Sequence, residues 1–129
     1  MMKNKRQGFT LIELLVVIAI IGLLATVVLA ALGPQRKNAR VAAAQSSMRN
    51  MLTAMQLCAG DGLDLNSPTE AGTVKICTSG DGSLTKWGPL PSGWDYGATQ
   101  DLTASDGEFS VNAAGDSAII TCNQSGCIK

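Results

Sequence analysis

The chain contains no histidine, and it has few of the features that catalytic sites require. Histidine is the usual general base and the most common metal ligand in proteins, so its absence argues against most hydrolytic and metal-dependent chemistry. Neither a Gly-x-Ser-x-Gly nucleophile motif nor a glycine-rich phosphate-binding loop is present. The sequence therefore predicts a protein that is not an enzyme.

Positive charge is scarce beyond the first few residues. Ten basic and ten acidic residues cancel over the 129 residues. Three bases, Lys3, Lys5 and Arg6, precede any acid, whereas acids outnumber bases from Gly33 onward. A mildly acidic domain without a basic stripe is not suited to hold a nucleic-acid backbone, so we expect no nucleic-acid contact. The early basic cluster is typical of a segment that stays on the cytoplasmic side of a membrane.

A long apolar segment follows this cluster. Phe9 to Leu32 form a run of 24 residues in which Glu13 is the single charged residue. As a helix, the run is about 36 Å long, enough to cross a hydrocarbon core of roughly 30 Å. The alternative is a cleaved secretory signal, but such signals have a shorter apolar region, and no clear Ala-x-Ala site closes this one. We therefore expect a membrane-spanning helix.

The rest of the chain changes character twice. Gly33-Pro34 predicts a kink, a pause or a restart of the helix. From there to about Leu57, apolar residues recur with a period close to 3.6, which indicates an amphipathic helix. Loop residues then dominate, with short strands expected at 73–77, 108–113 and 118–122, the last two joined as a hairpin by Ala114-Gly115-Asp116-Ser117.

These observations predict an α+β fold, in which a long N-terminal helix packs on a small antiparallel β-sheet. The first half of the helix spans a membrane and the second half is amphipathic. The expected segments are a basic leader (1–8), a transmembrane helix (9–32), its amphipathic continuation (33–59) and a loop-rich β domain (60–129).

Glu13 needs a partner, because a carboxylate at the centre of a bilayer costs roughly 3 kcal/mol, although less near the edge. If the chain is cut after Gly8, Phe9 carries a new terminal amine and Glu13 lies one helical turn away. The carboxylate is then well placed to pair with that amine or with the amine of a neighbour. The alternative is that Glu13 reaches water by snorkelling at the membrane edge.

The order Gly8-Phe9-Thr10-Leu11-Ile12-Glu13, followed by the apolar run, resembles the N-terminal signature of type IV prepilins and type II secretion pseudopilins. The resemblance implies a pilin-like fold, cleavage after Gly8 by a prepilin peptidase, methylation of Phe9, and engagement of a neighbour's amine by Glu13. It implies a single-pass protein of the bacterial cytoplasmic membrane with its N-terminus inside, and an extracytoplasmic filament after assembly. The implied partners are copies of the chain, other pilin-like subunits, the peptidase, a membrane assembly platform and membrane lipid.

The leading hypothesis is a structural filament subunit of a type IV pilus, a competence pilus or a type II secretion pseudopilus. Small residues in the apolar run, among them Gly22 and Ala25, are expected to allow neighbouring helices to approach closely. The alternative is a monomeric, membrane-anchored extracytoplasmic binding protein that displays the loop around Trp94. Because the chain has only five aromatic residues, we expect Trp87, Trp94 and Tyr96 to pack in the core.

Four cysteines allow three pairings. A small exported domain favours disulfides, and we predict Cys58–Cys77 and Cys122–Cys127. The alternatives are free thiols in a reducing compartment and a zinc site, although neither spacing is Cys-x-x-Cys.

No cofactor is expected, and calcium is the alternative considered. Acidic and amide residues sit in glycine-rich loops without the spacing of an EF-hand, which favours solvated turn residues over calcium ligands. These residues are Asp61, Asp64, Asn66, Asp81, Asp101 and Asp106.

Overall fold

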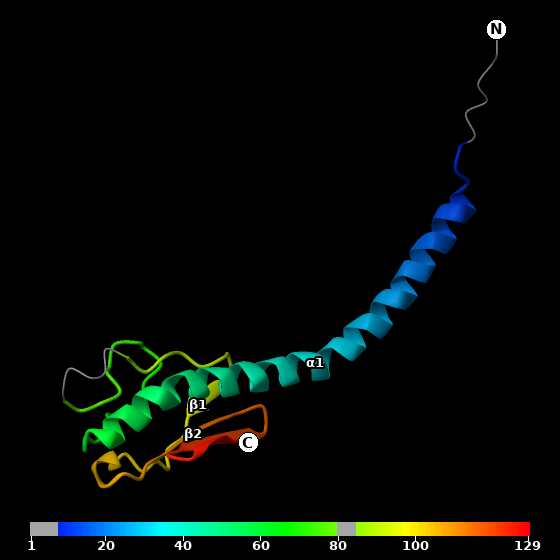
Figure 1. The fold of residues 1–129 in the computed structure, drawn as a ribbon. Helices are drawn as coiled ribbons and strands as arrows, with labels where there is room; N and C mark the ends of the chain where they lie inside the picture. The colour runs from blue at the N-terminus through cyan, green and yellow to red at the C-terminus, as the bar shows by residue number, and fades with distance from the viewer. Residues whose placement is uncertain (1–7, 80–84) are drawn as a thin grey trace. The chain divides into compact units, whose positions relative to one another are not determined.

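The computed structural model describes residues 8–79 and 85–129 (Figure 1). The basic leader therefore lies outside the described residues, except for Gly8. The chain divides into two compact units, Met1–Arg36 and Lys37–Lys129. We call the described part of the first unit, residues 8–36, the arm, and the second unit the head, and we describe each by itself.

One helix, α1, extends from Leu11 to Gly60 and contributes to both units (Figure 1). Pro34 lies inside it, so neither the pause nor the restart expected at Gly33-Pro34 occurs. A proline removes one backbone hydrogen bond from a helix interior, at a cost of about 3 kcal/mol. Strong helix formers on both sides, including alanine, leucine, arginine and lysine, offset that single loss.

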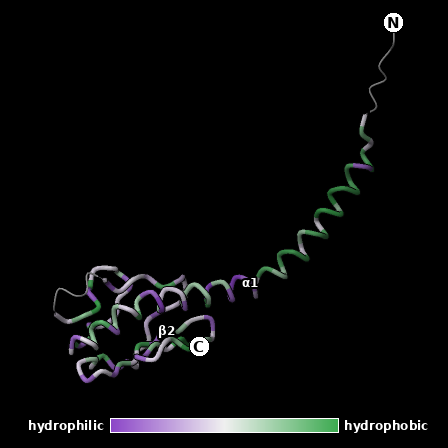
Figure 2. The backbone as a smooth tube through the Cα atoms, viewed as in Figure 1, coloured by the Kyte–Doolittle hydropathy of each residue, from purple (hydrophilic) through white to green (hydrophobic). Residues whose placement is uncertain are grey.

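The arm exposes its apolar side chains along its whole length. All residues from Leu11 to Leu32 are exposed. Most of them are leucine, isoleucine, valine or alanine, so this part of the chain is mostly hydrophobic (Figure 2). By length and composition, α1 is apolar enough to cross a membrane, and none of its most apolar stretch is buried within the chain. An exposed apolar surface of this size needs lipid or protein to cover it.

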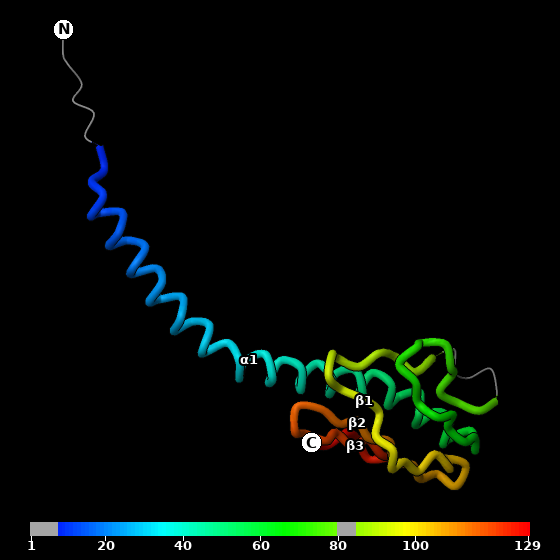
Figure 3. Tube along the Cα trace, turned by 180° about the vertical axis from the view of Figure 1, so that it is seen from behind, coloured from blue at the N-terminus to red at the C-terminus, as the bar shows by residue number. Residues whose placement is uncertain are grey.

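The head is a two-layer α+β structure, as expected. Its sheet is antiparallel, with four strands in the order β1-β2-β3-β4. The sheet lies beside the second half of α1 (Figures 1 and 3). The strands are β1 (Trp94–Tyr96), β2 (Ser110–Gly115), β3 (Ala118–Asn123) and β4 (Gly126–Ile128), and a short 3-10 helix, η1 (Ala104–Asp106), precedes β2. The half of α1 in the head packs its buried face against the sheet, and that face is formed by Val41, Ala44, Met48, Met51, Ala54, Met55 and Cys58.

The core between these layers contains the aromatic residues that the sequence assigned to it. Trp87 is 0% exposed and Trp94 is 2% exposed. The rings of Trp87 and Tyr96 meet edge to face, with centroids 5.7 Å apart. Trp94 and Tyr96 belong to β1, so part of the segment expected to be an irregular loop is a strand.

Two of the strand predictions are wrong: one strand is absent and another has different bounds. Residues 73–77 do not form a strand, and they pair only through isolated bridges, Leu65 with Cys77 and Lys75 with Lys86. The β2–β3 hairpin is longer than expected, because Ala114 and Gly115 continue β2 and leave a two-residue turn. The turn residues Asp116 and Ser117 have φ angles of 52° and 61°, as a type I′ turn requires.

Candidate functional site

The first site residues lie at the start of α1. Thr10 immediately precedes the helix, and its carbonyl accepts the first helical hydrogen bond from the Leu14 amide at 3.3 Å. Glu13 Oε2 accepts from the Thr10 amide at 2.8 Å and from Thr10 Oγ1 at 2.7 Å. Thr10 Oγ1 accepts from the Glu13 amide at 3.4 Å in return. This reciprocal arrangement is a capping box, which satisfies backbone amides that have no partner within the helix.

The capping box gives Glu13 an intramolecular partner that the sequence analysis missed. This partner could have been predicted from the sequence, because a threonine followed three residues later by a glutamate, before an apolar run, is the pattern of a capping box. Only Oε2 takes part in these bonds, and within the described residues Oε1 makes no hydrogen bond. The carboxylate therefore keeps one oxygen for a second donor.

Gly8 and Phe9 lie before the helix, in irregular backbone. Phe9 is 88% exposed, and a Cβ atom built on Gly8 would contact nothing within 4 Å. Packing within the chain therefore does not require glycine at position 8. Next to these residues, a hollow of about 400 Å³ is lined by Phe9, Ile12, Glu13, Val16 and Val17. Among the described residues that line this hollow, Glu13 is the only charged one, so the site offers one carboxylate on a face that is otherwise suited to lipid or another helix.

The structure pairs the four cysteines as the sequence analysis expected. Cys58 at the end of α1 is bonded to Cys77, with Cα atoms 5.5 Å apart. Cys122 and Cys127 occupy directly paired positions of β3 and β4 and are bonded across these strands. No cysteine is free. All four cysteines are therefore paired in this structure, as two disulfides and not as a zinc site or free thiols.

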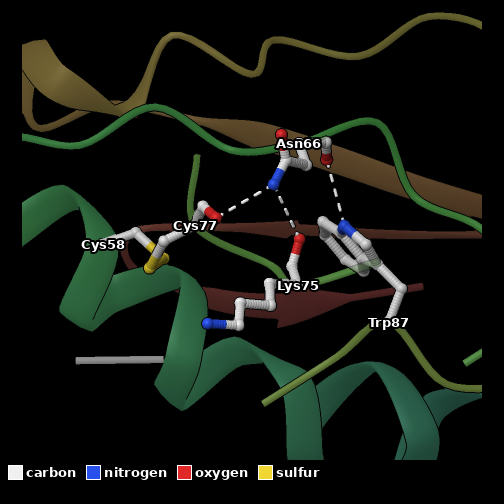
Figure 4. The surroundings of a disulfide bond; sticks show 5 residues. All are labelled: Cys58, Asn66, Lys75, Cys77 and Trp87. Carbon is white, nitrogen blue, oxygen red and sulfur yellow. Dashed lines mark hydrogen bonds between the residues drawn. A yellow bond between two sulfur atoms is a disulfide. The ribbon is translucent and has the colours of Figure 1, made fainter. Parts of the chain in front are cut away.

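Asn66 organises the loop beside the first disulfide (Figure 4). The side-chain Nδ2 of Asn66 donates to the backbone carbonyls of Lys75 and Cys77 at 3.0 and 2.9 Å. The backbone carbonyl of Asn66 accepts from Trp87 Nε1 at 3.0 Å. The side-chain amide thus adds two hydrogen bonds to residues 73–77, whose backbone also pairs with that of Asn66, Thr85 and Trp87. Asn66 therefore has a structural role in this loop.

Three of the acidic calcium candidates also accept hydrogen bonds from nearby backbone amides. Asp64 Oδ1 accepts from the Ser105 amide at 3.1 Å, and hydrogen bonds from Ser105 lower the pKa of the Asp64 carboxyl. Asp101 and Asp106 each cap a backbone amide two residues further along the chain. Asp81 lies outside the described residues. In residues 8–79 and 85–129, no three histidine, cysteine, aspartate or glutamate residues are grouped as metal ligands.

A second polar cluster, also missed by the sequence analysis, lies where α1 meets the hairpin. Arg40 Nε donates to Asp116 Oδ2 at 2.8 Å, and Arg40 Nη2 donates to Asp116 Oδ1. Trp94 Nε1 donates to Asp116 Oδ2 at 2.9 Å. The hydrogen bonds from Arg40, assisted by that from Trp94 and by the charges of Arg40 and Lys37, lower the pKa of Asp116 to about 2, despite the opposing effect of burial.

Gly115 allows this cluster to form. A Cβ at position 115 would lie 2.5 Å from the carbonyl oxygen of Gly93 and 2.6 Å from the Trp94 ring. Trp94 pairs with Gly115 in the sheet, so the indole lies directly over the glycine. A glycine is therefore needed at this position for Trp94 to reach Asp116.

The comparisons with known proteins agree with the N-terminal pattern. Residues 3–29 match the family described as the prokaryotic N-terminal methylation motif. Three type IV major fimbrial proteins named FimA, all from Dichelobacter nodosus, are each 42% identical to the chain over 65 residues. Each match covers 47% of this chain and 38% or 39% of the relative, so the chain spans about two fifths of the curated relatives it matches. No solved structure gives a significant match. The chain therefore carries a prepilin-type N-methylation motif, and about half of it is similar to type IV major fimbrial proteins.

Proposed function

We propose that this chain is the structural subunit of an extracytoplasmic filament of the type IV pilus kind. It is made as a precursor, cut after Gly8 by a prepilin peptidase, and methylated on the new terminal amine of Phe9. The observation that carries the proposal is the arm, an exposed apolar helix that holds a single carboxylate at its capped start. The homology to fimbrial proteins supports a structural subunit and not an enzyme.

The arm serves two environments in this proposal. Before assembly, it crosses the bacterial cytoplasmic membrane, with the N-terminus inside and the head outside. After assembly, the same apolar surface is covered by the arms of other copies. Lipid and protein are both apolar, so transfer from one to the other keeps the arm out of water.

Glu13 sets the register of the arms. Cleavage after Gly8 creates a positively charged amine on Phe9, one helical turn from the carboxylate of the same chain and within reach of a neighbour in a bundle. Oε1 of Glu13 is the oxygen left for such a donor. A hydrogen bond between two charged groups is roughly twice as strong as a neutral one, and it is stronger in an apolar bundle than in water. One carboxylate in a long apolar surface therefore specifies one alignment.

The head remains outside the membrane and is built for an oxidising compartment. Its two disulfides tie α1 to the loop after it and β3 to β4. The competing hypothesis, a monomeric binding protein displaying the loop around Trp94, loses its main support because that indole is buried and bonded to Asp116. The similarity to type IV major fimbrial proteins favours a pilus over a secretion pseudopilus. Other pilin-like subunits and a membrane assembly platform complete the proposed set of partners.

The test is the intact mass and N-terminal sequence of the protein taken from its native membrane, together with sheared surface material. We expect a chain that begins at Phe9, carries one additional methyl group, and is found in sheared filaments. A chain that keeps its leader and is absent from filaments would support a plain membrane anchor. A chain that lacks the whole apolar run would show that the arm is a discarded signal.

A further inference from the structure

We infer that Thr10, by capping α1, determines where the helix begins and so keeps the Gly8–Phe9 bond in non-helical backbone for cleavage. This inference rests on the proposed processing after Gly8. In that step, water adds across the amide bond, the Gly8 carbonyl becomes a carboxylate, and the Phe9 nitrogen leaves as an amine. Thr10 takes no part in the chemistry, so it is a positioning residue.

The geometry places the helix start immediately after the cleavage site. Leu11 is the first residue of α1, and the first helical hydrogen bond ends on the Thr10 carbonyl. The two side chains of the capping box satisfy the amides of Thr10 and Glu13 in this arrangement. If the helix grew by one turn, Thr10 would become an interior residue, and its hydroxyl would lose its capping position. The box therefore stabilises a start at Leu11 over an earlier start.

An earlier start would enclose the bond that is cut. A helical turn that included Gly8 and Phe9 would wind their peptide bond into the backbone hydrogen-bond ladder. Proteolytic cleavage occurs where the backbone is exposed and free of regular structure. Gly8 already disfavours helix growth, because glycine is among the weakest helix formers. Thr10 adds a second barrier to helix growth from the other side of the bond, and Phe9, which lies between them, is exposed.

The size of the effect follows from the strength of a helix cap. Replacing a threonine cap by an apolar residue shifts the balance between the two starts by about fivefold, the factor that corresponds to about 1 kcal/mol. If only the non-helical form is cut, kcat/KM for cleavage falls with the non-helical fraction, and therefore by at most about fivefold. Thr10→Val removes the hydroxyl and keeps the β-branched shape. Thr10→Ser keeps the hydroxyl and is the matched control, because serine caps helices at least as well as threonine.

The experiment measures cleavage of the full-length precursor in detergent micelles by its prepilin peptidase. We expect kcat/KM to fall by up to about fivefold for Thr10→Val and to stay at the wild-type value for Thr10→Ser. Backbone chemical shifts of Gly8 and Phe9, recorded on the uncut precursors, supply a readout that does not depend on the enzyme. These shifts are expected to be non-helical in the wild type and Thr10→Ser, and to move toward helical values in Thr10→Val.

Two results would overturn the inference. The first is equal cleavage of Thr10→Val and wild type, and the second is a Thr10→Val precursor in which Phe9 stays non-helical. Failure of the proposed function looks different, because the wild-type precursor itself would then remain uncut by the peptidase. The three substrates are therefore compared in one assay, and the wild type decides whether the processing proposal holds before the variants are interpreted.

Discussion

Arg40 and Asp116 are 76 positions apart in the chain, and their side chains form a two-point contact that joins α1 to the tip of the β2–β3 hairpin. The Asp116 side chain is 12% exposed, whereas that of Arg40 is 42% exposed. Trp94 of β1 donates to the same carboxylate, so one aspartate connects a helix, a strand and a turn. Both layers of the head are therefore held in register at this end of the sheet.

Substitution of Asp116 by asparagine should lower the melting temperature of the head. The amide has one acceptor oxygen where the carboxylate has two, so the two-point contact with Arg40 is lost and the charge that Arg40 faces is removed. Circular dichroism of the full chain in detergent would measure the change. Asp95→Asn is the matched control, because Asp95 is an exposed acid in the same sheet. Equal melting temperatures for Asp116→Asn and wild type would show that the contact does not stabilise the head.

The same carboxylate predicts how stability depends on pH. The pKa of Asp116 is lowered in the folded head, from an ordinary value of 3.8 to about 2, chiefly by the hydrogen bonds from Arg40. A lowered pKa means that the ionised form stabilises the fold. The contribution is complete above about pH 4 and is lost as pH falls toward about 2. Urea unfolding between pH 7 and pH 2 should show this loss, and the loss should be smaller in Asp116→Asn, where only other groups such as Asp64 continue to titrate.

Replacing Ser117, which follows Asp116 in the β2–β3 turn, by glycine should stabilise the head. Ser117 has a φ of 61°, in the left-handed region that costs a non-glycine residue roughly 1–2 kcal/mol. Glycine removes that cost but adds backbone freedom to the unfolded chain, worth roughly 0.5–1 kcal/mol. We expect Ser117→Gly to raise the free energy of unfolding by about 0.5–1 kcal/mol. Chemical denaturation at neutral pH is the measurement.

Asp116→Gly is the informative comparison for this substitution. Asp116 has a φ of 52°, so glycine relieves a similar backbone cost there but removes the contacts with Arg40 and Trp94. Ser117→Gly should therefore stabilise the head and Asp116→Gly should destabilise it. Stabilisation by both changes would mean that the stability of this turn depends on its backbone conformation alone and not on the aspartate side chain.

The hairpin also shows what sequence patterns could predict and what they could not. Alternating apolar residues predicted both strands of the hairpin, because a period of two is a local property. The two-residue turn was missed, because Asp-Ser lacks the glycine or asparagine that normally marks a type I′ turn. Its conformation is stabilised by Arg40 on a distant helix, and a contact across 76 positions leaves no local pattern in a single sequence.

At the start of α1, by contrast, the contact that the prediction missed does have a local sequence pattern. Glu13 was identified from its isolation in the apolar run, and its local partner Thr10 was present in the pattern three residues earlier but was not used. The predicted strand at 73–77 failed for another reason. Its residues pair only through isolated bridges and single backbone hydrogen bonds, and the Asn66 side chain and the Cys58–Cys77 bridge also hold them in place. Side-chain hydrogen bonds of this kind depend on the tertiary fold.

The two disulfides should differ in their effect on stability. The Cys58–Cys77 bridge closes a loop with a sequence separation of 19, and the Cys122–Cys127 bridge closes one of 5. In the chain-entropy description, the longer loop corresponds to roughly 3 kcal/mol and the shorter to roughly 2 kcal/mol. The longer bridge also orders residues 73–77, which form no strand. We expect paired serine substitutions at Cys58 and Cys77 to lower the denaturation midpoint more than those at Cys122 and Cys127, and the reverse order would contradict this account.

Glu13 has two tasks in the proposed filament, and two substitutions separate them. Glu13→Gln keeps an oxygen that can complete the capping box but removes the charge that would attract a terminal amine. Glu13→Ala removes both. We expect both variants to be cut after Gly8 and to stay in the membrane, because the Thr10 hydroxyl still caps the amide of residue 13 and the apolar run is unchanged.

We also expect both variants to be depleted from sheared filaments by more than tenfold relative to wild type, a factor that corresponds to about 1.4 kcal/mol per subunit contact. Quantitative blotting of membrane and sheared fractions would measure this ratio. Wild-type incorporation of Glu13→Gln would show that hydrogen bonding, and not charge pairing, aligns the arms, and wild-type incorporation of Glu13→Ala would remove Glu13 from the assembly step altogether.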